Sequence, residues 1–160
     1  MCFPAFLQLI RTSVDAHPLQ WPSNFEILVE SLRLRPDLNP VKALDLKRNI
    51  LQAMVHMMTR GYVLPVLDFV YRGAGELDAA LLRNFVTFVM KRVSPPYSTR
   101  FAQTLTRLLL HPKIHTAIKT SPATTQKNLL EFIKFCRQTE GLMNKRQSQS
   151  LRALKNTFHQ

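Results

Sequence analysis

Apolar side chains recur every three or four residues along most of this sequence, which is the spacing of one face of an α-helix. The stretch 78–93 shows the pattern well, because Leu82, Phe85 and Val89 fall on one side of a helix drawn through it. Only four glycines occur in 160 residues, whereas an all-β protein needs glycine for its tight turns. The sequence therefore predicts an all-α protein.

Prolines and capping residues divide this pattern into about eight helices with short connections. Asn39 followed by Pro40 is a strong start signal, and Gly61 suits a left-handed turn at a helix end. Ser23 or Asn24 is expected to cap an earlier helix, which Pro36 closes. Antiparallel neighbours of this kind form either an α-solenoid of HEAT type or an irregular helical bundle. The expected helices cover about residues 3–14, 24–35, 40–60, 63–72, 78–93, 99–110, 112–119 and 125–138.

Residues 140–160 differ from the rest of the chain. Gly141 breaks the helical pattern, and polar residues dominate after it. Leu151, Leu154 and Phe158 have helical spacing, so we expect a weak amphipathic helix that forms on contact, and otherwise a frayed tail. We therefore expect an all-helical HEAT-like domain over 1–139 and a basic, flexible tail over 140–160.

The sequence shows no sign of a membrane span or of a disulfide framework. No apolar run reaches the roughly 18–20 residues that cross a bilayer. The apolar start, residues 1–10, lacks a basic segment before it and a small-residue cleavage site after it, which favours a buried helix over a signal peptide. Cys2 and Cys136 are too few for a disulfide framework or a four-ligand zinc site, and their use fits a reducing compartment.

Charge is distributed very unevenly between the two halves. Residues 1–78 contain 8 basic and 8 acidic side chains, whereas residues 79–160 contain 14 basic and 2 acidic ones. The net charge of +12 therefore belongs to the second half. Such asymmetry favours an anionic partner, which is a nucleic acid, an acidic protein surface or a membrane headgroup layer, over a basic face that only aids solubility.

The outer faces of the later helices are the expected location of this basic surface. Arg100 and Arg107 are seven residues apart and point away from the apolar face of their helix, and Lys127 and Lys134 repeat the spacing on the last helix. Lys91 and Arg92 lie at the end of the helix that stops before residue 94, where the helix dipole stabilises positive charge. The candidate nucleic-acid-binding residues are Lys91, Arg92, Arg100, Arg107, Lys127 and Lys134.

No pattern of catalytic, metal-binding or cofactor-binding residues is found. His111 and His115 are four apart, but no third ligand lies nearby and His111 precedes a proline. Phosphate-binding glycine loops and nucleophile elbows are absent from the sequence. His56 is expected to be a satisfied core or groove histidine. We therefore expect no enzyme, no cofactor and no small-molecule substrate.

The segment 94–98, Ser94-Pro95-Pro96-Tyr97-Ser98, is expected to be a structural turn. Its two prolines stop the preceding helix, Ser98 or Thr99 caps the next one, and Tyr97 covers the hinge. Two prolines make too short a polyproline segment to be a good recognition motif.

Four motifs in the same order resemble the C-terminal region of the negative elongation factor C/D family. The segment 82–89, Leu-Arg-Asn-Phe-Val-Thr-Phe-Val, runs into the Ser-Pro-Pro-Tyr turn as the family's helix does. The turn 60–66, Arg-Gly-Tyr-Val-Leu-Pro-Val, the Ile-Lys-Thr of 118–120 and the helix 131–136 also match. The resemblance covers about residues 40–137 well and 1–39 loosely, and family members are several times longer.

This resemblance implies a HEAT-like protein without enzymatic activity, acting in the nucleus within a complex. It implies a negative elongation factor complex that holds RNA polymerase II in a paused state, with docking against a negative elongation factor B-like partner and contact with single-stranded RNA. From charge and periodicity alone, the alternative is a free-standing basic helical module that binds nucleic acid.

Overall fold

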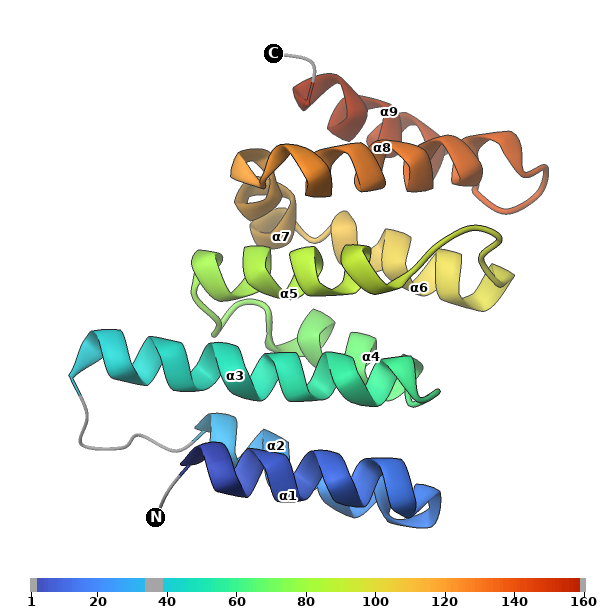
Figure 1. Ribbon diagram of the computed structural model, residues 1–160. Helices are drawn as coiled ribbons and strands as arrows, with labels where there is room; N and C mark the ends of the chain where they lie inside the picture. Colours follow the sequence, from blue (N-terminus) through green and yellow to red (C-terminus); the bar gives the residue numbers. More distant parts are fainter. Residues whose placement is uncertain (1–2, 34–38, 159–160) are drawn as a thin grey trace. The chain divides into compact units, whose positions relative to one another are not determined.

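The computed structural model describes residues 3–33 and 39–158 (Figure 1). Nine α-helices and two short 3-10 helices form the regular structure of these residues, and no strand occurs among them. The all-α prediction is confirmed. The chain divides into two compact units, Met1–Val66 (unit 1) and Leu67–Gln160 (unit 2), and the boundary falls within one helix.

Unit 1 is built around one long helix. Its helices are α1 (Phe3–Ala16), α2 (Trp21–Arg33) and α3 (Pro40–Thr59), with a 3-10 turn over Pro18–Gln20. The α3 helix packs against both α1 and α2. Its inward face contributes Ile50, Leu51, Met54 and Met57, none of which has exposed surface. The methionines beside His56 therefore fill the core of unit 1.

The start and end of α3 follow the sequence signals. The side chain of Asn39 accepts a hydrogen bond from the backbone N–H of Lys42 at 2.8 Å, and Pro40 occupies the first turn. Gly61 follows the helix with a φ of +119°, a conformation that side chains with a Cβ disfavour. Both predictions for this helix are confirmed.

The predicted cap of α2 is wrong. The helix begins at Trp21, because Pro22 is tolerated in a first turn, where its missing N–H is not needed. Asn24 lies inside the helix and is buried, and its side-chain amide donates to the hydroxyl of Ser13 on α1 at 3.1 Å. Pro36, expected to end this helix, lies outside the described residues.

Unit 2 contains most of the helices (Figure 1). Here α5 packs against α7 and α8, and α8 packs against α9, which fits the expected stack of helices. Phe85 and Phe132 are the largest fully buried side chains of this unit. The helices are α4 (Leu64–Gly73, which crosses the unit boundary), α5 (Ala79–Arg92), α6 (Thr99–Leu109), α7 (Pro112–Ala117), α8 (Ala123–Gln138) and α9 (Lys145–Thr157), with a 3-10 turn over Ile118–Thr120.

The segment expected to form either a weak amphipathic helix or a frayed tail contains the helix α9, which is in contact with α8. Asn144 and Gln147 form a reciprocal capping box at the start of α9. Leu151 and Leu154 have no exposed surface, as their helical spacing predicts. The helix α9 therefore buries these two leucines within unit 2, where it packs against α8. The division into a domain over 1–139 and a flexible tail over 140–160 stays a prediction. None of the described helices is both long and apolar enough to cross a lipid bilayer.

Candidate functional site

The six predicted cations are all exposed, and they lie at three places in unit 2. Lys91 and Arg92 end α5, and Arg100 lies in the first turn of α6. Arg107 lies in the last turn of α6. Lys127 and Lys134 lie on α8 and line one groove, which includes none of the other four.

Arg107 is occupied by contacts within unit 2. Its guanidinium lies 3.2 Å from a carboxylate oxygen of Asp68 and 4.5 Å from the ring centroid of Tyr71. The other oxygen of Asp68 accepts from Arg72 at 3.0 Å. These contacts join α6 to α4 and neutralise part of the charge of Arg107. Arg107 is therefore less suited to binding an anion than its position on the helix predicts.

The connection between α5 and α6 combines cations with aromatic rings. The hydroxyl of Ser98 accepts from the backbone N–H of Phe101 at 3.2 Å, so Ser98 is the helix cap. The ring of Tyr97 stacks on Phe101 at 5.9 Å and meets Phe132 and Phe135 edge-on at 5.2 and 5.0 Å. These contacts supply a physical basis for the structural turn predicted over 94–98.

Tyr97 remains half-buried rather than fully enclosed. Burial raises the pKa of its phenol, and the carboxylate of Glu131 adds to the shift. The ring is therefore neutral over the physiological range. Among the described residues, no carboxylate lies within ion-pair distance of Lys91, Arg92 or Arg100.

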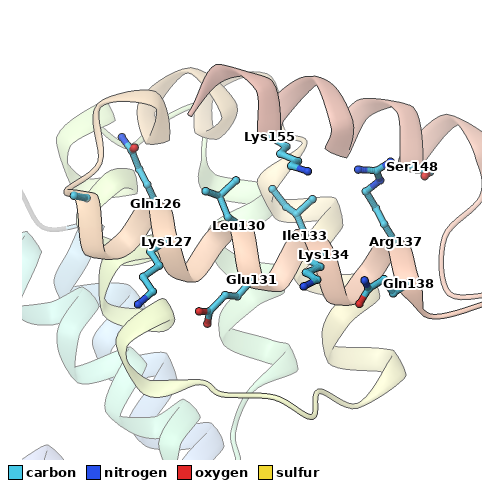
Figure 2. A pocket seen from close by; sticks show the side chains of 11 residues that line it. Gln126, Lys127, Leu130, Glu131, Ile133, Lys134, Arg137, Gln138, Ser148 and Lys155 are labelled. Atoms are coloured by element: carbon cyan, nitrogen blue, oxygen red, sulfur yellow. The ribbon is translucent and has the colours of Figure 1, made fainter. Parts of the chain in front are cut away.

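A groove of about 800 Å³ runs between α8 and α9 (Figure 2). We call it the α8–α9 groove. Its lining residues are Ala123, Gln126, Lys127, Leu130, Glu131, Ile133, Lys134, Arg137 and Gln138 of α8 and Ser148 and Lys155 of α9. Four cations and one carboxylate thus surround it.

Two of these four cations were missed from the sequence. Arg137 lies seven residues after Leu130, on the side of α8 that faces α9, whereas Lys134 lies on the other side, so the spacing of the predicted cations does not identify it. Lys155 lies on α9, and no spacing rule links two helices that are distant in sequence.

The two histidines that lie four residues apart have different surroundings. His111 is the N-cap of α7, where its Nδ1 accepts from the backbone N–H of Lys113 at 3.3 Å. Burial, and then the charge of Lys119, lowers the pKa of His115. Across 3–33 and 39–158, no three His, Cys, Asp or Glu side chains gather in a way that could hold a metal ion.

Cys136 is also enclosed by its surroundings. Burial raises the pKa of its thiol, and the hydroxyl of Thr106 lies 3.7 Å from the sulfur. The buried thiol is protonated and unsuited to nucleophilic chemistry. Cys2 lies outside the described residues.

In unit 1, one carboxylate joins α1 to α3. Asp15 lies 2.8 Å from Nε2 of His56 and accepts from the guanidinium of Arg60 at 2.8 Å. His56 therefore has a polar partner, as predicted. The hydrogen bond from His56 is the largest cause of a lowered pKa for the Asp15 carboxyl.

Comparison with known proteins identifies the family. The chain matches the sequence model of the TH1 protein family over residues 2–140, a range that ends before α9. It is 32% identical over 144 residues to negative elongation factor D of Sus scrofa, which covers 88% of this chain and 24% of the relative. Negative elongation factor D of Mus musculus is 31% identical with the same coverage.

The chain thus spans about a quarter of the length of these curated relatives. The motifs around the Ser-Pro-Pro-Tyr turn lie inside the matched range, so the match and the motifs point to the same family. The protein therefore belongs to the TH1 family, that of the negative elongation factor C/D proteins.

Proposed function

We propose that this protein is a non-enzymatic scaffold subunit of a negative transcription elongation factor complex that promotes pausing of RNA polymerase II in the nucleus. The observation that carries the proposal is the family match over residues 2–140. An all-helical architecture supports it, because stacked helices present long surfaces to protein partners. The proposed partners are RNA polymerase II and a negative elongation factor B-like protein, called the B-like partner below.

Unit 1 has the features of a protein-docking surface. Among the described residues, the large apolar side chains that are exposed all lie in this unit. Leu19 is 97% exposed and Val41 is 78% exposed. Contiguous apolar patches mark surfaces that a protein partner covers, and Leu9, Leu19, Ile27 and Val41 are the exposed side chains from which unit 1 could build one. We therefore assign the contact with the B-like partner to unit 1.

Co-purification tests the scaffold proposal. The full chain should retain the B-like partner after nuclease treatment, because protein contacts hold the two together. Leu19→Asp with Val41→Asp should reduce retention, whereas reversing Lys91 and Arg92 to Glu should leave it unchanged. Both pairs are exposed, so each variant should fold. If nuclease treatment releases the partner from the unsubstituted chain, nucleic acid bridges the two proteins, and this result would contradict the proposal.

We further propose that single-stranded RNA contacts the α5–α6 connection. Lys91, Arg92 and Arg100 supply cations for phosphates, and the half-buried rings of Tyr97 and Phe101 supply surfaces for bases. Reversing Lys91 and Arg92 to Glu should weaken RNA binding and make the log-log salt slope shallower by about 0.7 per lost phosphate contact.

A matched control for this RNA experiment exists on α9. Lys145 and Arg146 are also adjacent, exposed cations at a helix end, and their reversal changes the net charge equally. Equal weakening by both pairs would show that RNA responds to net charge alone and would remove the α5–α6 connection from the proposal.

The second candidate function is a free-standing basic module that binds nucleic acid. The net charge of +12 in residues 79–160 favours it. Such a module would bind RNA alone as tightly as within a complex, and its binding would depend steeply on salt.

A further inference from the structure

The α8–α9 groove has two rows of side chains along the exposed face of α8 (Figure 2). Leu130, Ile133 and Arg137 lie on the side of α8 that faces α9, and Lys155 of α9 approaches Ile133. Lys127 and Lys134 lie on the other side of α8, together with Glu131. The groove therefore has Leu130 and Ile133 in one row with Arg137, two lysines along the far edge of α8 and Lys155 on its α9 side.

The lining explains how cations and apolar groups share this groove. Ile133 is fully buried and forms part of its floor, whereas Leu130 is half-buried and remains accessible. The aliphatic stems of lysine and arginine add apolar surface while their charged ends remain in water. Lys127, Lys134 and Arg137 have no hydrogen-bond or ion-pair partner within the described chain, so their charges are available to a ligand.

This chemistry fits a peptide better than a nucleic acid. Single-stranded RNA is held by aromatic side chains on which bases stack, and no aromatic residue lines the groove. An amphipathic helix instead needs an apolar strip with charged edges. The groove offers this arrangement along the 16 residues of α8, a length of about 24 Å at 1.5 Å per residue.

We propose that the α8–α9 groove binds an acidic amphipathic helix of a partner protein. The apolar face of the helix contacts Leu130 and the aliphatic stems of the cations around it. Its carboxylates pair with Lys127 and Lys134 on one edge, with Lys155 on the α9 side and with Arg137 at the end of the row that contains Leu130. The proposal goes beyond the family match, which ends at residue 140 and does not include the α9 wall of the groove.

Glu131 sets the register of the bound helix. It is the one carboxylate among the groove residues, and it lies between Lys127 and Lys134 along α8. An acidic helix must therefore avoid placing a carboxylate opposite Glu131, since like charges would repel. Replacing Glu131 by Gln should strengthen binding, a gain that misfolding of the variant cannot produce.

A binding experiment with a designed peptide tests the proposal. The probe is a fluorescein-labelled helical peptide of about 16 residues, matched to α8, with leucines every three or four positions and glutamates on both flanks. Lys127→Glu with Lys134→Glu in the full chain should weaken binding about tenfold or more, because two attractions become repulsions. Glu131→Gln should tighten it about twofold. Lys145→Glu with Arg146→Glu, outside the groove, should leave the affinity unchanged.

Each contrary result overturns the proposal in a different way. Equal binding of a peptide with glutamine for glutamate would show that charge does not select the ligand. Failure of the probe peptide to bind at all would contradict an acidic helical occupant. Oligouridylate binding that is lost with the Lys127 and Lys134 pair would identify the groove as an RNA site. Self-association that the same pair abolishes would make the occupant a second copy of the chain. None of these results depends on whether the B-like partner is retained.

Discussion

Phe85 lies in the middle of α5 and has no exposed surface. Replacing it by Ala leaves a cavity in the core of unit 2 and should lower the free energy of unfolding by about 3–5 kcal/mol. Phe88→Ala on the same helix is the matched control. Because Phe88 is half-buried, its replacement should lower the free energy of unfolding by less. Urea unfolding of both variants measures the difference. A cost below about 1 kcal/mol for Phe85→Ala, the range of exposed sites, would mean that its face of α5 is not packed.

Asp15 gives unit 1 a dependence on pH. Its pKa lies below the ordinary value of 3.8, chiefly because His56 hydrogen-bonds to it, and the guanidinium of Arg60 also favours its charged form. A carboxyl with a lowered pKa in the folded state stabilises the fold fully above its ordinary pKa. This contribution is lost as the pH falls through the folded-state pKa.

We therefore expect Asp15→Asn to lower the midpoint of urea unfolding near neutral pH. The gap from the parent should close as the pH falls below about 4. Asp45→Asn is the control, because within 3–33 and 39–158 Asp45 forms an ion pair only with Arg48 on its own helix. A gap that stays constant down to the acid range would show that the Asp15 carboxylate does not couple to folding.

Arg107 shows what helical spacing can and cannot predict about a site. Spacing predicts its exposure correctly, because the position of a residue on a helix depends only on its neighbours in sequence. Its partner Asp68 is 39 residues away on another helix. Such a pairing depends on how helices pack, so no local pattern contains it.

The helices themselves were largely predictable because their ends carry local signals. The Asn39–Pro40 start, Gly61 and the Ser98 cap all appear in the structure. The start of α2 was missed, because Pro22 is accommodated in the first turn and the helix begins before the expected cap. Asn24 lies inside the helix and bonds to Ser13 of α1, a tertiary contact that no local pattern predicts.

The connection between α5 and α6 should depend on the Tyr97 ring. Tyr97→Ala removes contacts with three phenylalanines and should lower the free energy of unfolding by about 3 kcal/mol, near the low end for aromatic-to-alanine changes because the ring is half-buried. Tyr97→Phe keeps the ring and should be nearly neutral. Thermal unfolding of both variants measures this. Equal effects of the two changes would assign the contribution to the hydroxyl and contradict a role for ring packing.

The α9 helix should be held by two leucines. Leu151→Ala with Leu154→Ala removes its buried contacts and should make residues 145–157 sensitive to limited proteolysis. Arg152→Ala on the same helix is exposed and should have no effect. Protection of the segment in the double variant would show that the capping box alone maintains the helix. The groove proposal would then lose its reason to include α9.

At the scale of the whole molecule, the charge asymmetry was readable from sequence, but its division into separate surfaces was not. Residues 79–160 carry the whole net charge, yet the six predicted cations lie at the α5–α6 connection, beside Asp68 and along the α8–α9 groove. Only the packing of the helices separates these three places. A single basic RNA surface is therefore too simple a description of unit 2.

Salt dependence distinguishes a scaffold protein from a nucleic-acid-binding module most directly. The measurement is retention of the B-like partner by the full chain across a salt series after nuclease treatment, beside binding of labelled single-stranded RNA. We predict that retention stays nearly constant, because apolar contacts carry it. RNA affinity should fall with a log-log slope of about −0.7 per phosphate contact. A partner that is released with the same slope as RNA, or that is absent after nuclease treatment, would contradict the scaffold function.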